Sequence, residues 1–311
     1  MKIAVTGGAG FIGSHIVDAY IAEGHDVVVL DNFSTGKKEN VNKQAGVEKV
    51  DITDAAKIRK IFEKEKFDVV NHHAAQVNVR ASVDNPTEDA TVNILGGINI
   101  YEAARATDVK KVIFASSGGA VYGEQRYFPA DEKHPKRPFS PYGVSKHANE
   151  KYLVYYKMVY GIEDVILRYT NVYGPRQNPQ GEAGVIAIFT EKMMKNDQPI
   201  INGDGTQTRD YVYVDDIVRA NVLALTEKAR GIYNCSTGVE FSVNTVFQIL
   251  KLRTGCACKM VHGPAKPGEQ QRSVCSFRKI EKGLGWKPEY NLEQGIARTV
   301  EWFRQQTPSK K

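Results

Sequence analysis

KIAVTGGAGFIG, residues 2–13, decides the fold of this chain. An apolar run typical of a β-strand breaks into a glycine turn, and an amphipathic helical pattern follows at once. This strand–turn–helix context is what a dinucleotide-binding fingerprint requires. We expect Gly7 to take the tight turn, Gly10 to let backbone N–H groups approach a pyrophosphate, and Gly13 to let the helix pack on the strand. The N-terminus of that helix then offers unpaired N–H groups and a positive dipole to the phosphates.

A second apolar run, DVVVL at 26–30, ends in Asp31. In dinucleotide-binding folds a carboxylate at this place accepts hydrogen bonds from the adenosine ribose and repels a 2′-phosphate. The sequence therefore predicts NAD, rather than NADP, as the cofactor. The alternative is an empty glycine turn in an α/β protein, which the second strand and its terminal carboxylate disfavour.

The composition is that of an ordinary globular protein. Of the 311 residues, 41% are hydrophobic and 25% are charged, which suits one large core, or one large and one small lobe. No apolar run approaches the roughly 18 residues that span a bilayer, and the chain enters its first strand at once. We therefore expect no membrane partner, no signal peptide and a cytoplasmic location. The net charge of +6 comes from scattered lysines, which predicts a solvated surface and no nucleic-acid partner.

Metal binding is not predicted from the cysteines and histidines. Cys256 and Cys258 are too closely spaced for the usual chelating loop, and no second pair follows. Together with Cys235 and Cys275 they are expected to be free thiols. The pair at residues 72–73, His-His, has no carboxylate pair at ligand spacing, so we expect these histidines to be satisfied within the fold at a strand end.

Strand and helix patterns alternate through the first half of the chain. Strand-like runs lie near 2–6, 26–30, 68–71, 111–115 and 164–168. Alternating βα units with apolar strands predict an α/β fold, a doubly wound parallel Rossmann sheet with helices on both faces. After about residue 168, loops rich in Gly, Pro, Asn and Gln predict a smaller α/β lobe over the carboxyl ends of the strands, where such sheets bind ligands.

The predicted domain boundaries follow from this change of pattern. Residues 211–214, a helix from Asp215 and residues 232–235 are expected to return to the main sheet. We therefore predict a NAD-binding Rossmann domain made of residues 1–168 plus about 211–235. The substrate-binding lobe is predicted to comprise about 169–210 plus 236–311.

Tyr142 and Lys146 are the predicted catalytic pair. They lie four residues apart in a helical stretch and so share one helix face. A free tyrosine is only roughly 0.1% ionised at neutral pH, and lowering its pKa by about 3 units requires on the order of 4 kcal/mol. A nearby ammonium and an oxidised nicotinamide, both positive, can supply this together. The tyrosinate then serves as base toward a substrate hydroxyl while hydride leaves for NAD. Alone, the spacing also fits simple packing beside a solvated lysine; the glycine fingerprint favours catalysis.

Nine segments carry a resemblance to a known family. They are TGGAGFIG (6–13), DNFSTG (31–36), VDITD (50–54), HHAAQ (72–76), SSGGAVYG (116–123), YGVSK (142–146), RYTNVYGP (168–175), GDGTQTRDYVYVDD (203–216) and PGEQQRS (267–273). By these segments the chain resembles the extended short-chain dehydrogenase/reductases and, within them, the UDP-glucose/UDP-galactose 4-epimerases, over essentially its whole length. The segments are highly specific for nucleotide-sugar chemistry and less specific for which sugar.

The resemblance implies a set of NAD-binding residues. They follow the cofactor from the glycine turn, past the adenosine, to the nicotinamide half. The implied residues are Gly7, Gly10, Phe11, Ile12 and Gly13 at the pyrophosphate; Asp31, Asn32, Ser34, Thr35 and Gly36 at the adenosine; Asp51 and Ile52 at the adenine edge; and Ala74, Ala75, Gln76, Asn93, Ser116, Tyr142 and Lys146 toward the nicotinamide.

The resemblance also implies a UDP-sugar site. Asn171 is similar to the residue that binds a UDP phosphate, and Arg209 to the family's diphosphate clamp, a task that suits an arginine fork. Glu269 resembles the acidic residue at the uridine ribose. The implied substrate-binding residues are Ser117, Gly118, Tyr142, Asn171, Gly184, Val185, Asn202, Arg209, Lys266, Glu269 and Ser273.

Three positions depart from the family pattern. The family usually has Ser or Thr four residues before the Tyr of its V-Y-G motif, and here that position is Gly118, so Ser117 or a water is expected to contact the reacting sugar oxygen. Lys266 replaces a phosphate-binding arginine, which keeps the charge and loses the fork. Ser273 stands where the family carries a gatekeeper; a small residue there predicts that N-acetylated sugars also enter the pocket.

The sequence thus predicts an isomerase that epimerises carbon 4 of a UDP-sugar with NAD, through a transient 4-keto intermediate. The predicted substrates are UDP-glucose and UDP-galactose, together with UDP-N-acetylglucosamine and UDP-N-acetylgalactosamine. Gly119 and Ala120 stand where a 4,6-dehydratase would need an acidic pair, which disfavours elimination and decarboxylation. A UDP-glucuronate 4-epimerase and a non-catalytic NAD-binding regulator stay open. Helical stretches near 89–107 and 142–160 carry apolar residues on more than one side, which predicts a homodimer, with intrachain burial as the alternative.

Overall fold

A computed structural model describes residues 1–180, 184–266 and 270–306. Its main feature is a parallel sheet of seven strands in the order β10-β6-β5-β4-β1-β2-β3. This confirms the predicted doubly wound Rossmann sheet. The strands are β1 (Lys2–Thr6), β2 (Asp26–Asp31), β3 (Gly46–Lys49), β4 (Val69–His72), β5 (Lys111–Ser117), β6 (Glu163–Tyr169) and β10 (Gly231–Cys235). The edge strand β3 escaped prediction because its side chains are mostly exposed and carry no apolar pattern.

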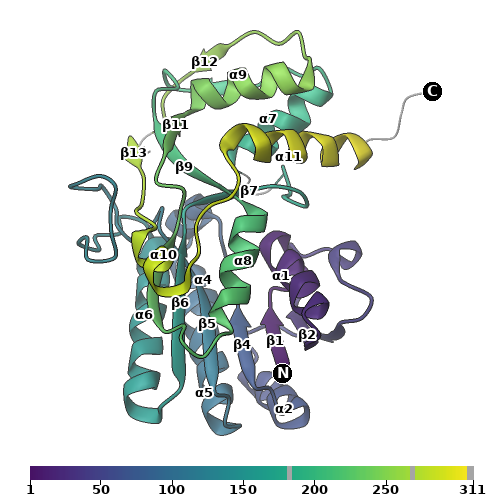
Figure 1. The fold of residues 1–311 in the computed structure, drawn as a ribbon, viewed down its shortest axis with the longest axis vertical. Coiled ribbons are helices and arrows are strands. Elements are labelled where there is room, and N and C mark those ends of the chain that lie inside the picture. The colour runs from purple at the N-terminus through teal and green to yellow at the C-terminus, as the bar shows by residue number, and fades with distance from the viewer. Residues whose placement is uncertain (181–183, 267–269, 307–311) are drawn as a thin grey trace.

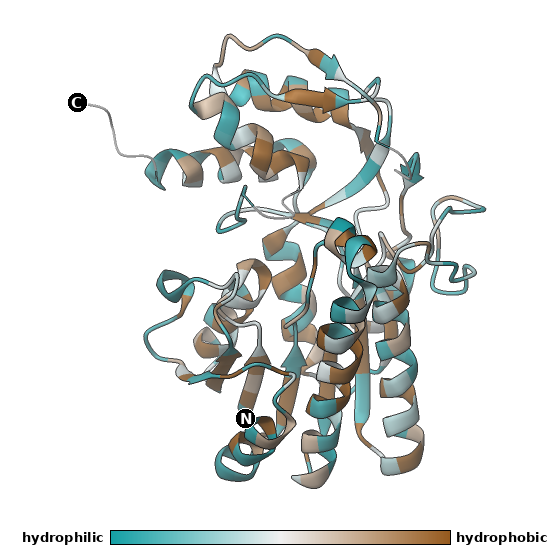
Figure 2. Cartoon of the chain, turned by 180° about the vertical axis from the view of Figure 1, so that it is seen from behind, coloured by the Kyte–Doolittle hydropathy of each residue, from teal (hydrophilic) through white to brown (hydrophobic). Residues whose placement is uncertain are grey.

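Helices cover both faces of this sheet (Figure 1). On one face lie α1 (Phe11–Ala22) and α8 (Val214–Ala224), and on the other lie α2 (Ala55–Glu65), α5 (Gly96–Ala106) and α6 (Pro141–Tyr160). Successive strand residues alternate between the two cores: Ile3 and Val5 face α1, while Ala4 faces α2 and α5. Both faces are therefore apolar, and Figure 2 shows the main sheet largely brown. Each fully buried Ile or Val contributes about 1.5–3 kcal/mol.

Local capping explains the elements that border the site. Asn78 caps α3 (Val79–Asp84), and Asn85, followed by a proline, caps α4 (Pro86–Ala90). A π-helical turn, Thr91–Leu95, joins α4 to α5. Ser140 accepts a hydrogen bond from Gly143 N at the start of α6, and Gly161, with φ 75°, ends that helix. A short 3-10 turn, η1 (Lys38–Asn40), follows the second strand.

A smaller lobe sits over the carboxyl ends of the main strands (Figure 1). One of its sheets contains β11 (Glu240–Ser242), β9 (Thr208–Tyr213), β13 (Arg272–Ser273) and β7 (Asn171–Tyr173), and the other pairs β8 (Ile200–Asn202) with β12 (Val261–Gly263). The lobe also holds α7 (Val185–Met194), α9 (Val243–Thr254) and α11 (Leu292–Gln306) around a core of its own, whereas α10 (Arg278–Leu284) contacts β10.

The expected return of residues 211–214 to the main sheet is wrong. Residues 211–213 belong to β9, which pairs only with strands of the smaller sheet among the described residues, and Val214 begins α8. Helix α8 packs in the core of the main sheet, and β10 does join that sheet. Strand β9 runs between the two cores, because Val212 packs in the main core while Tyr211 and Tyr213 pack in the lobe core. The division of the chain into two domains stays a prediction.

Two of the exclusions made from the sequence concern the membrane and the thiols. Within the described ranges, none of the helices has both the length and the apolar character that a bilayer span demands. The four cysteines are free and buried, as predicted.

Candidate active site

The glycine turn, residues 7–13, forms a cradle in which positions 7 and 13 have no room for a side chain. Gly7 has φ +69°, and a Cβ there would lie 2.8 Å from Ala74 N. A Cβ on Gly13 would lie 2.2 Å from Gly7 O, so helix α1 can approach β1 only because residue 13 is glycine. Gly10 caps α1 without a side-chain hydrogen bond. The first amides of the helix, from Phe11 onward, thus stay available for an anionic ligand.

Asp31 connects the glycine turn to the loop after β2, where the adenosine is predicted to bind and which we call the adenosine rim. Its carboxylate is 7% exposed and accepts hydrogen bonds from Ala9 N at 3.0 Å and Phe33 N at 2.8 Å. A carboxylate has about four lone-pair sites, which leaves capacity for a ribose hydroxyl. Gly36 lies against the same carboxylate, because a Cβ there would be 2.8 Å from Asp31 Oδ1.

The outer rim of this region is exposed. Asn32 donates to Asp51 Oδ2 at 2.8 Å, and these two side chains join the loop after β2 to the loop after β3. Ser34 and Thr35 are open to solvent, whereas Ile52 is buried. The structure therefore brings the predicted adenosine-lining residues together on one side of the glycine turn.

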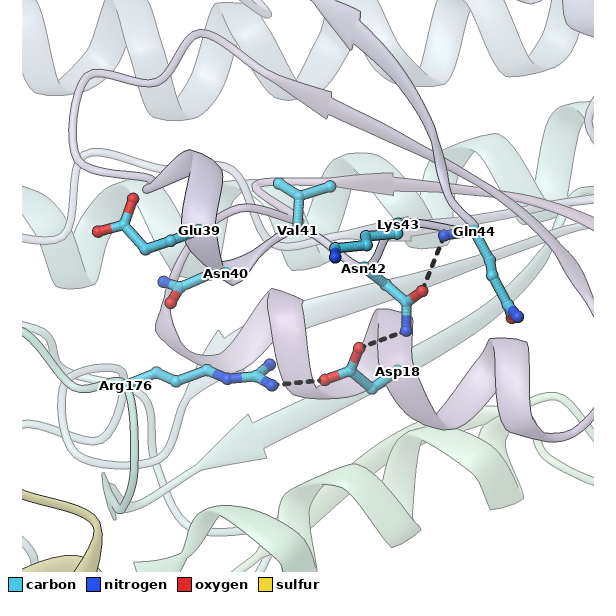
Figure 3. A pocket seen from close by; sticks show the side chains of 8 residues that line it. All are labelled: Asp18, Glu39, Asn40, Val41, Asn42, Lys43, Gln44 and Arg176. Atoms are coloured by element: carbon cyan, nitrogen blue, oxygen red, sulfur yellow. Dashed lines mark hydrogen bonds and ion pairs between the residues drawn. The ribbon is translucent and has the colours of Figure 1, made fainter. Parts of the chain in front are cut away.

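A polar pocket of about 440 Å³ lies outside this rim, between α1 and the loop that follows β2 (Figure 3). Arg176, from the segment after β7, pairs with Asp18 Oδ2 at 2.7 Å, and Asn42 donates to Asp18 Oδ1 at 2.8 Å. Gln44 N donates to Asn42 Oδ1 in turn. These contacts hold the loop on α1 and connect it to the smaller lobe; the sequence analysis missed them because the partners are far apart in the chain.

Beyond β4 the chain is held by a buried carboxylate that sequence reasoning missed. Asn93 and Gln76 exchange two hydrogen bonds, each of 2.9 Å. Asp89, fully buried, accepts from Asn93 Nδ2 at 2.9 Å and from Ser145 Oγ at 2.6 Å. Asp89 thus connects two predicted cofactor-binding residues to α6. Its only sequence signal was its place four residues before Asn93.

Helix α6 places Tyr142 and Lys146 beside the end of β5. Lys146 is 4% exposed and donates to Ala115 O at 2.9 Å. Its Nζ lies 5.8 Å from the centroid of the Tyr142 ring. Burial lowers the pKa of Lys146 to about 8, although the negative charges of Asp89 and Glu150 oppose this. The ammonium is therefore mostly protonated at neutral pH and lies close to the tyrosine, as the catalytic prediction requires.

A buried ion pair lies beside the carboxyl end of β5. Glu150, one turn after Lys146, accepts from Arg168 Nε at 2.7 Å and Nη2 at 2.6 Å. Ser116 Oγ donates to the same carboxylate at 2.6 Å. Burial alone would raise the pKa of Glu150, but the hydrogen bonds and charge of Arg168 lower it to about 2. The Ser116 hydroxyl thus donates to Glu150 and ties the end of β5 to α6.

The loop after β5 shows where a substitute hydroxyl could act. A Cβ on Gly118 would lie 3.4 Å from Arg168 O, Tyr169 O and Cys275 Sγ, so residue 118 faces β6 and the segment that follows β13. A Cβ on Gly119 would lie 3.9 Å from both Ser117 Oγ and Asn171 Oδ1. The Ser117 hydroxyl therefore lies on the side of the loop where the predicted phosphate ligand Asn171 is found.

Three predicted substrate-binding residues lie on β9 or on the strands that pair with it. Its Arg209 is in register with Ser273 of β13, and its Tyr211 is in register with Asn171 of β7. Three residues that span about a hundred positions of sequence are thus neighbours in one sheet. Ser273 is 1% exposed, and its hydroxyl has no hydrogen-bond partner among the described residues. Its gatekeeper role stays a prediction.

The other predicted substrate residues lie elsewhere in the lobe. Gly184 caps α7, and Val185 begins that helix. Asn202 ends β8 in the two-stranded sheet, and Lys266 lies three residues after β12, so neither belongs to the sheet of Arg209. Lys266 is exposed. Glu269 lies outside the described residues.

Comparison with known proteins shows the family of this chain. The model of the NAD dependent epimerase/dehydratase family matches residues 3–236. The chain belongs to this family. A relative from Methanocaldococcus jannaschii, named putative UDP-glucose 4-epimerase, is 53% identical over 97% of this chain and 98% of its own length.

Two solved structures of epimerases superpose closely on this family member. The UDP-glucose 4-epimerase of Thermotoga maritima, solved with UDP-glucose, has a TM-score of 0.97 at 46% identity and covers 98% of this chain and 99% of its own. The UDP-N-acetylglucosamine 4-epimerase of Methanobrevibacter ruminantium, in complex with UDP-N-acetylmuramic acid, has a TM-score of 0.93 at 36% identity, covering 98% and 99%.

The residues present fit NAD, the cofactor of this epimerase/dehydratase family. At Gly7 and Gly13 the chain packs too closely for any side chain, as a dinucleotide-binding turn requires. The uncapped amides of α1 suit a pyrophosphate, and Asp31 borders the adenosine rim. Tyr142 and Lys146 lie toward the opposite end of the carboxyl edge of the sheet, beside β5.

Proposed function

We propose that this protein is a UDP-sugar 4-epimerase that interconverts UDP-glucose and UDP-galactose. The observation that carries the proposal is the buried Lys146, whose ammonium lies beside the Tyr142 ring at the end of β5. Asn171 and Arg209 lie in one sheet of the lobe that covers that edge (Figure 1), and we propose that they hold a nucleoside diphosphate. The identity of the epimerase relatives supports the same reaction.

In the proposed reaction Tyr142 takes the proton of the sugar 4-hydroxyl. It later returns the proton to the same oxygen, when carbon 4 has the opposite configuration. NAD, when bound, supplies a reversible hydride acceptor. Lys146 favours the tyrosinate by its positive charge, because an ammonium close to a phenol stabilises the ionised form. Ser117 donates a hydrogen bond to the reacting oxygen in place of the missing hydroxyl at Gly118. General acid–base groups of this kind contribute about 10²–10⁴-fold in rate.

Arg209 and Asn171 hold the diphosphate while the sugar ring turns over. A guanidinium presents a planar fork that matches phosphate oxygens, and the amide adds a neutral donor. Because both residues lie in the smaller sheet, the nucleotide stays fixed to the lobe. The sugar can then present either face of carbon 4 to the same tyrosine.

The loop after β5 favours epimerisation over elimination. A 4,6-dehydratase needs an acid and a base beside the ring, and the chain offers Gly119 and Ala120 at those positions. The two carboxylates whose charges act on Lys146, Asp89 and Glu150, are both buried and hydrogen-bonded within the protein. Neither is placed to protonate a leaving hydroxyl.

The pocket is also proposed to accept UDP-N-acetylglucosamine and UDP-N-acetylgalactosamine. Ser273, next to Arg209 in the sheet, has one heavy atom beyond its Cβ, so a larger group at carbon 2 meets little steric opposition. The relative from Methanobrevibacter ruminantium is named for this class of sugar. Ser273→Tyr should remove the N-acetyl activity and spare the hexose, since a clash against one substrate is an effective source of discrimination.

The test is a substrate panel with wild type and Tyr142→Phe. Purified protein is incubated with UDP-glucose, UDP-N-acetylglucosamine and UDP-glucuronate, and the epimers are separated by chromatography. We expect turnover of the first two and a loss of about 100-fold or more in Tyr142→Phe, with NAD still bound. Conversion of UDP-glucuronate alone, or a Tyr142→Phe rate near that of wild type, would contradict the proposal. No turnover of any sugar despite bound NAD would favour a non-catalytic regulator.

We further propose a homodimer formed through α6. Its outer face exposes Tyr152, Tyr155, Met158 and Val159, the third of these at 79%. Exposed apolar and aromatic side chains gathered on one helix face are typical of an interface. Light scattering should give twice the monomer mass for wild type and the monomer mass for Met158→Glu; a monomeric wild type would refute this. The cytoplasmic location stays a prediction.

A further inference from the structure

His73 lies at the first residue after β4 and is only half satisfied by the protein. Its Nε2 is 3.0 Å from the hydroxyl of Tyr169, and the two rings stack at 5.8 Å. Its Nδ1 is enclosed, yet no hydrogen-bond partner for it exists among the described residues. The expectation that this histidine is fully satisfied within the fold is therefore wrong.

The surrounding hydrogen bonds assign the tautomer of the ring. Asn221 donates through Nδ2 to Ile217 O at 2.9 Å and to the Tyr169 hydroxyl at 2.8 Å, while its Oδ1 accepts from Asn71. The Tyr169 oxygen is thus an acceptor toward Asn221, and its own proton points to His73 Nε2. A neutral imidazole that accepts at Nε2 carries its proton on Nδ1. The unpartnered atom of His73 is therefore a buried N–H donor.

The ring stays neutral at physiological pH. Burial lowers the pKa of His73 to about 3, and the positive charge of Lys146 acts in the same direction. A buried donor without an acceptor is unfavourable, so a ligand that supplies an oxygen at this point gains affinity from it. The proton on Nδ1 makes His73 a donor only, which selects an oxygen acceptor rather than a cation.

The position of His73 indicates which ligand that is. Its peptide lies against the phosphate cradle, because a Cβ on Gly7 would be 3.1 Å from His73 C. Its backbone N–H donates to Thr6 Oγ1 at the end of β1. On the other side, Tyr169 is in register with Ser117, next to the catalytic pair. The ring thus lies between the glycine turn and the catalytic pair.

We propose that His73 Nδ1–H donates a hydrogen bond to an oxygen of NAD between its pyrophosphate and its nicotinamide ribose. Tyr169 is a positioning residue in this scheme, because its hydroxyl holds the imidazole in the donor tautomer. The proposal goes beyond the sugar reaction and depends only on NAD occupying the cleft. A failure of the epimerase assay would leave it intact, since its readouts are binding and proton position.

The first test measures ligand binding to NAD-free protein by calorimetry. His73→Phe keeps a ring of similar size and removes the donor. NAD and ADP-ribose contain the proposed acceptor and AMP lacks it. We expect His73→Phe to bind NAD and ADP-ribose about 10- to 100-fold more weakly, the range for a hydrogen bond to a charged group, and AMP unchanged. His25→Phe, at the opposite end of the sheet beside Tyr20, is the matched control and should bind all three like wild type.

Two outcomes of that titration would overturn the proposal: NAD affinity of His73→Phe within about 2-fold of wild type, or an equal loss for AMP. If His73→Phe does not fold, a measurement on the wild-type protein tests the proposal instead. Nitrogen-15 NMR of the histidine rings should show the Nδ1–H tautomer of His73 without NAD and a changed Nδ1–H resonance with NAD. A proton on Nε2, or an Nδ1 signal that NAD leaves unchanged, would refute the assignment.

Discussion

Replacing Lys146 by methionine is expected to stabilise the fold while it destroys catalysis. Lys146 is 4% exposed and donates to Ala115 O. Burial lowers its pKa from 10.5 to about 8, even though the charges of Asp89 and Glu150 raise it in part. The native state therefore holds an ammonium whose charged form is less favourable than it is in the unfolded chain.

The pKa difference sets the size of the effect. One pH unit is worth about 1.4 kcal/mol, so a fall from 10.5 to about 8 corresponds to about 3 kcal/mol of destabilisation at neutral pH. Losing the hydrogen bond from the ammonium to Ala115 O costs about 1.5–3 kcal/mol, which leaves a net gain of up to about 1.5 kcal/mol for Lys146→Met. Because the folded-state pKa is the lower one, the penalty is complete below about pH 8 and vanishes as the pH rises to 10.5.

The assay is urea unfolding of NAD-free protein at neutral pH and near pH 10, since bound NAD would add its own stabilisation. Lys146→Met should be the more stable protein at neutral pH, and its advantage should disappear at the higher pH. Its epimerase rate should fall by about 100-fold or more. Lys60→Met, exposed on α2, is the control and should change stability by less than about 0.5 kcal/mol. A Lys146→Met protein less stable than wild type at neutral pH would refute the reasoning.

Three further substitutions test the geometry of the site. Gly13→Ala should abolish NAD binding in calorimetry, because its Cβ would lie 2.2 Å from Gly7 O; affinity like wild type would contradict this. Glu150→Gln should lower the free energy of unfolding in urea by about 3–5 kcal/mol, because it leaves the guanidinium of Arg168 buried without its carboxylate. That deficit should shrink as the pH falls from 4.5 toward 2, where wild type loses the same charge; a constant deficit would argue against the ion pair. The free energy of unfolding of Gly118→Ser should stay within about 1 kcal/mol of the wild-type value, since a Cβ at this position meets its neighbours at 3.4 Å. A larger fall in the free energy of unfolding would show that the position has no room for a side chain.

The sequence by itself determined the parts of the site that are formed by residues close to one another along the chain. The glycine turn could be predicted because the approach of α1 to β1 is governed by residues six positions apart, Gly7 and Gly13. Tyr142 and Lys146 share a face because of the period of one helix. The doubly wound parallel sheet could be predicted because most of its strands are apolar runs buried on both faces, which leave a strong pattern. Strand β3 left none, because it is exposed at the edge.

Tertiary structure alone decided which distant residues meet. Arg209 and Ser273 became neighbours because β9 pairs with β13, and a strand pattern does not name its partner, so residues 211–214 were assigned to the wrong sheet. The depressed pKa of Lys146 required its burial to be known. The donor state of His73 required Tyr169, ninety-six residues away. Periodicity fixes which face a side chain takes; hydrogen-bond partners and desolvation depend on what the rest of the chain places against that face.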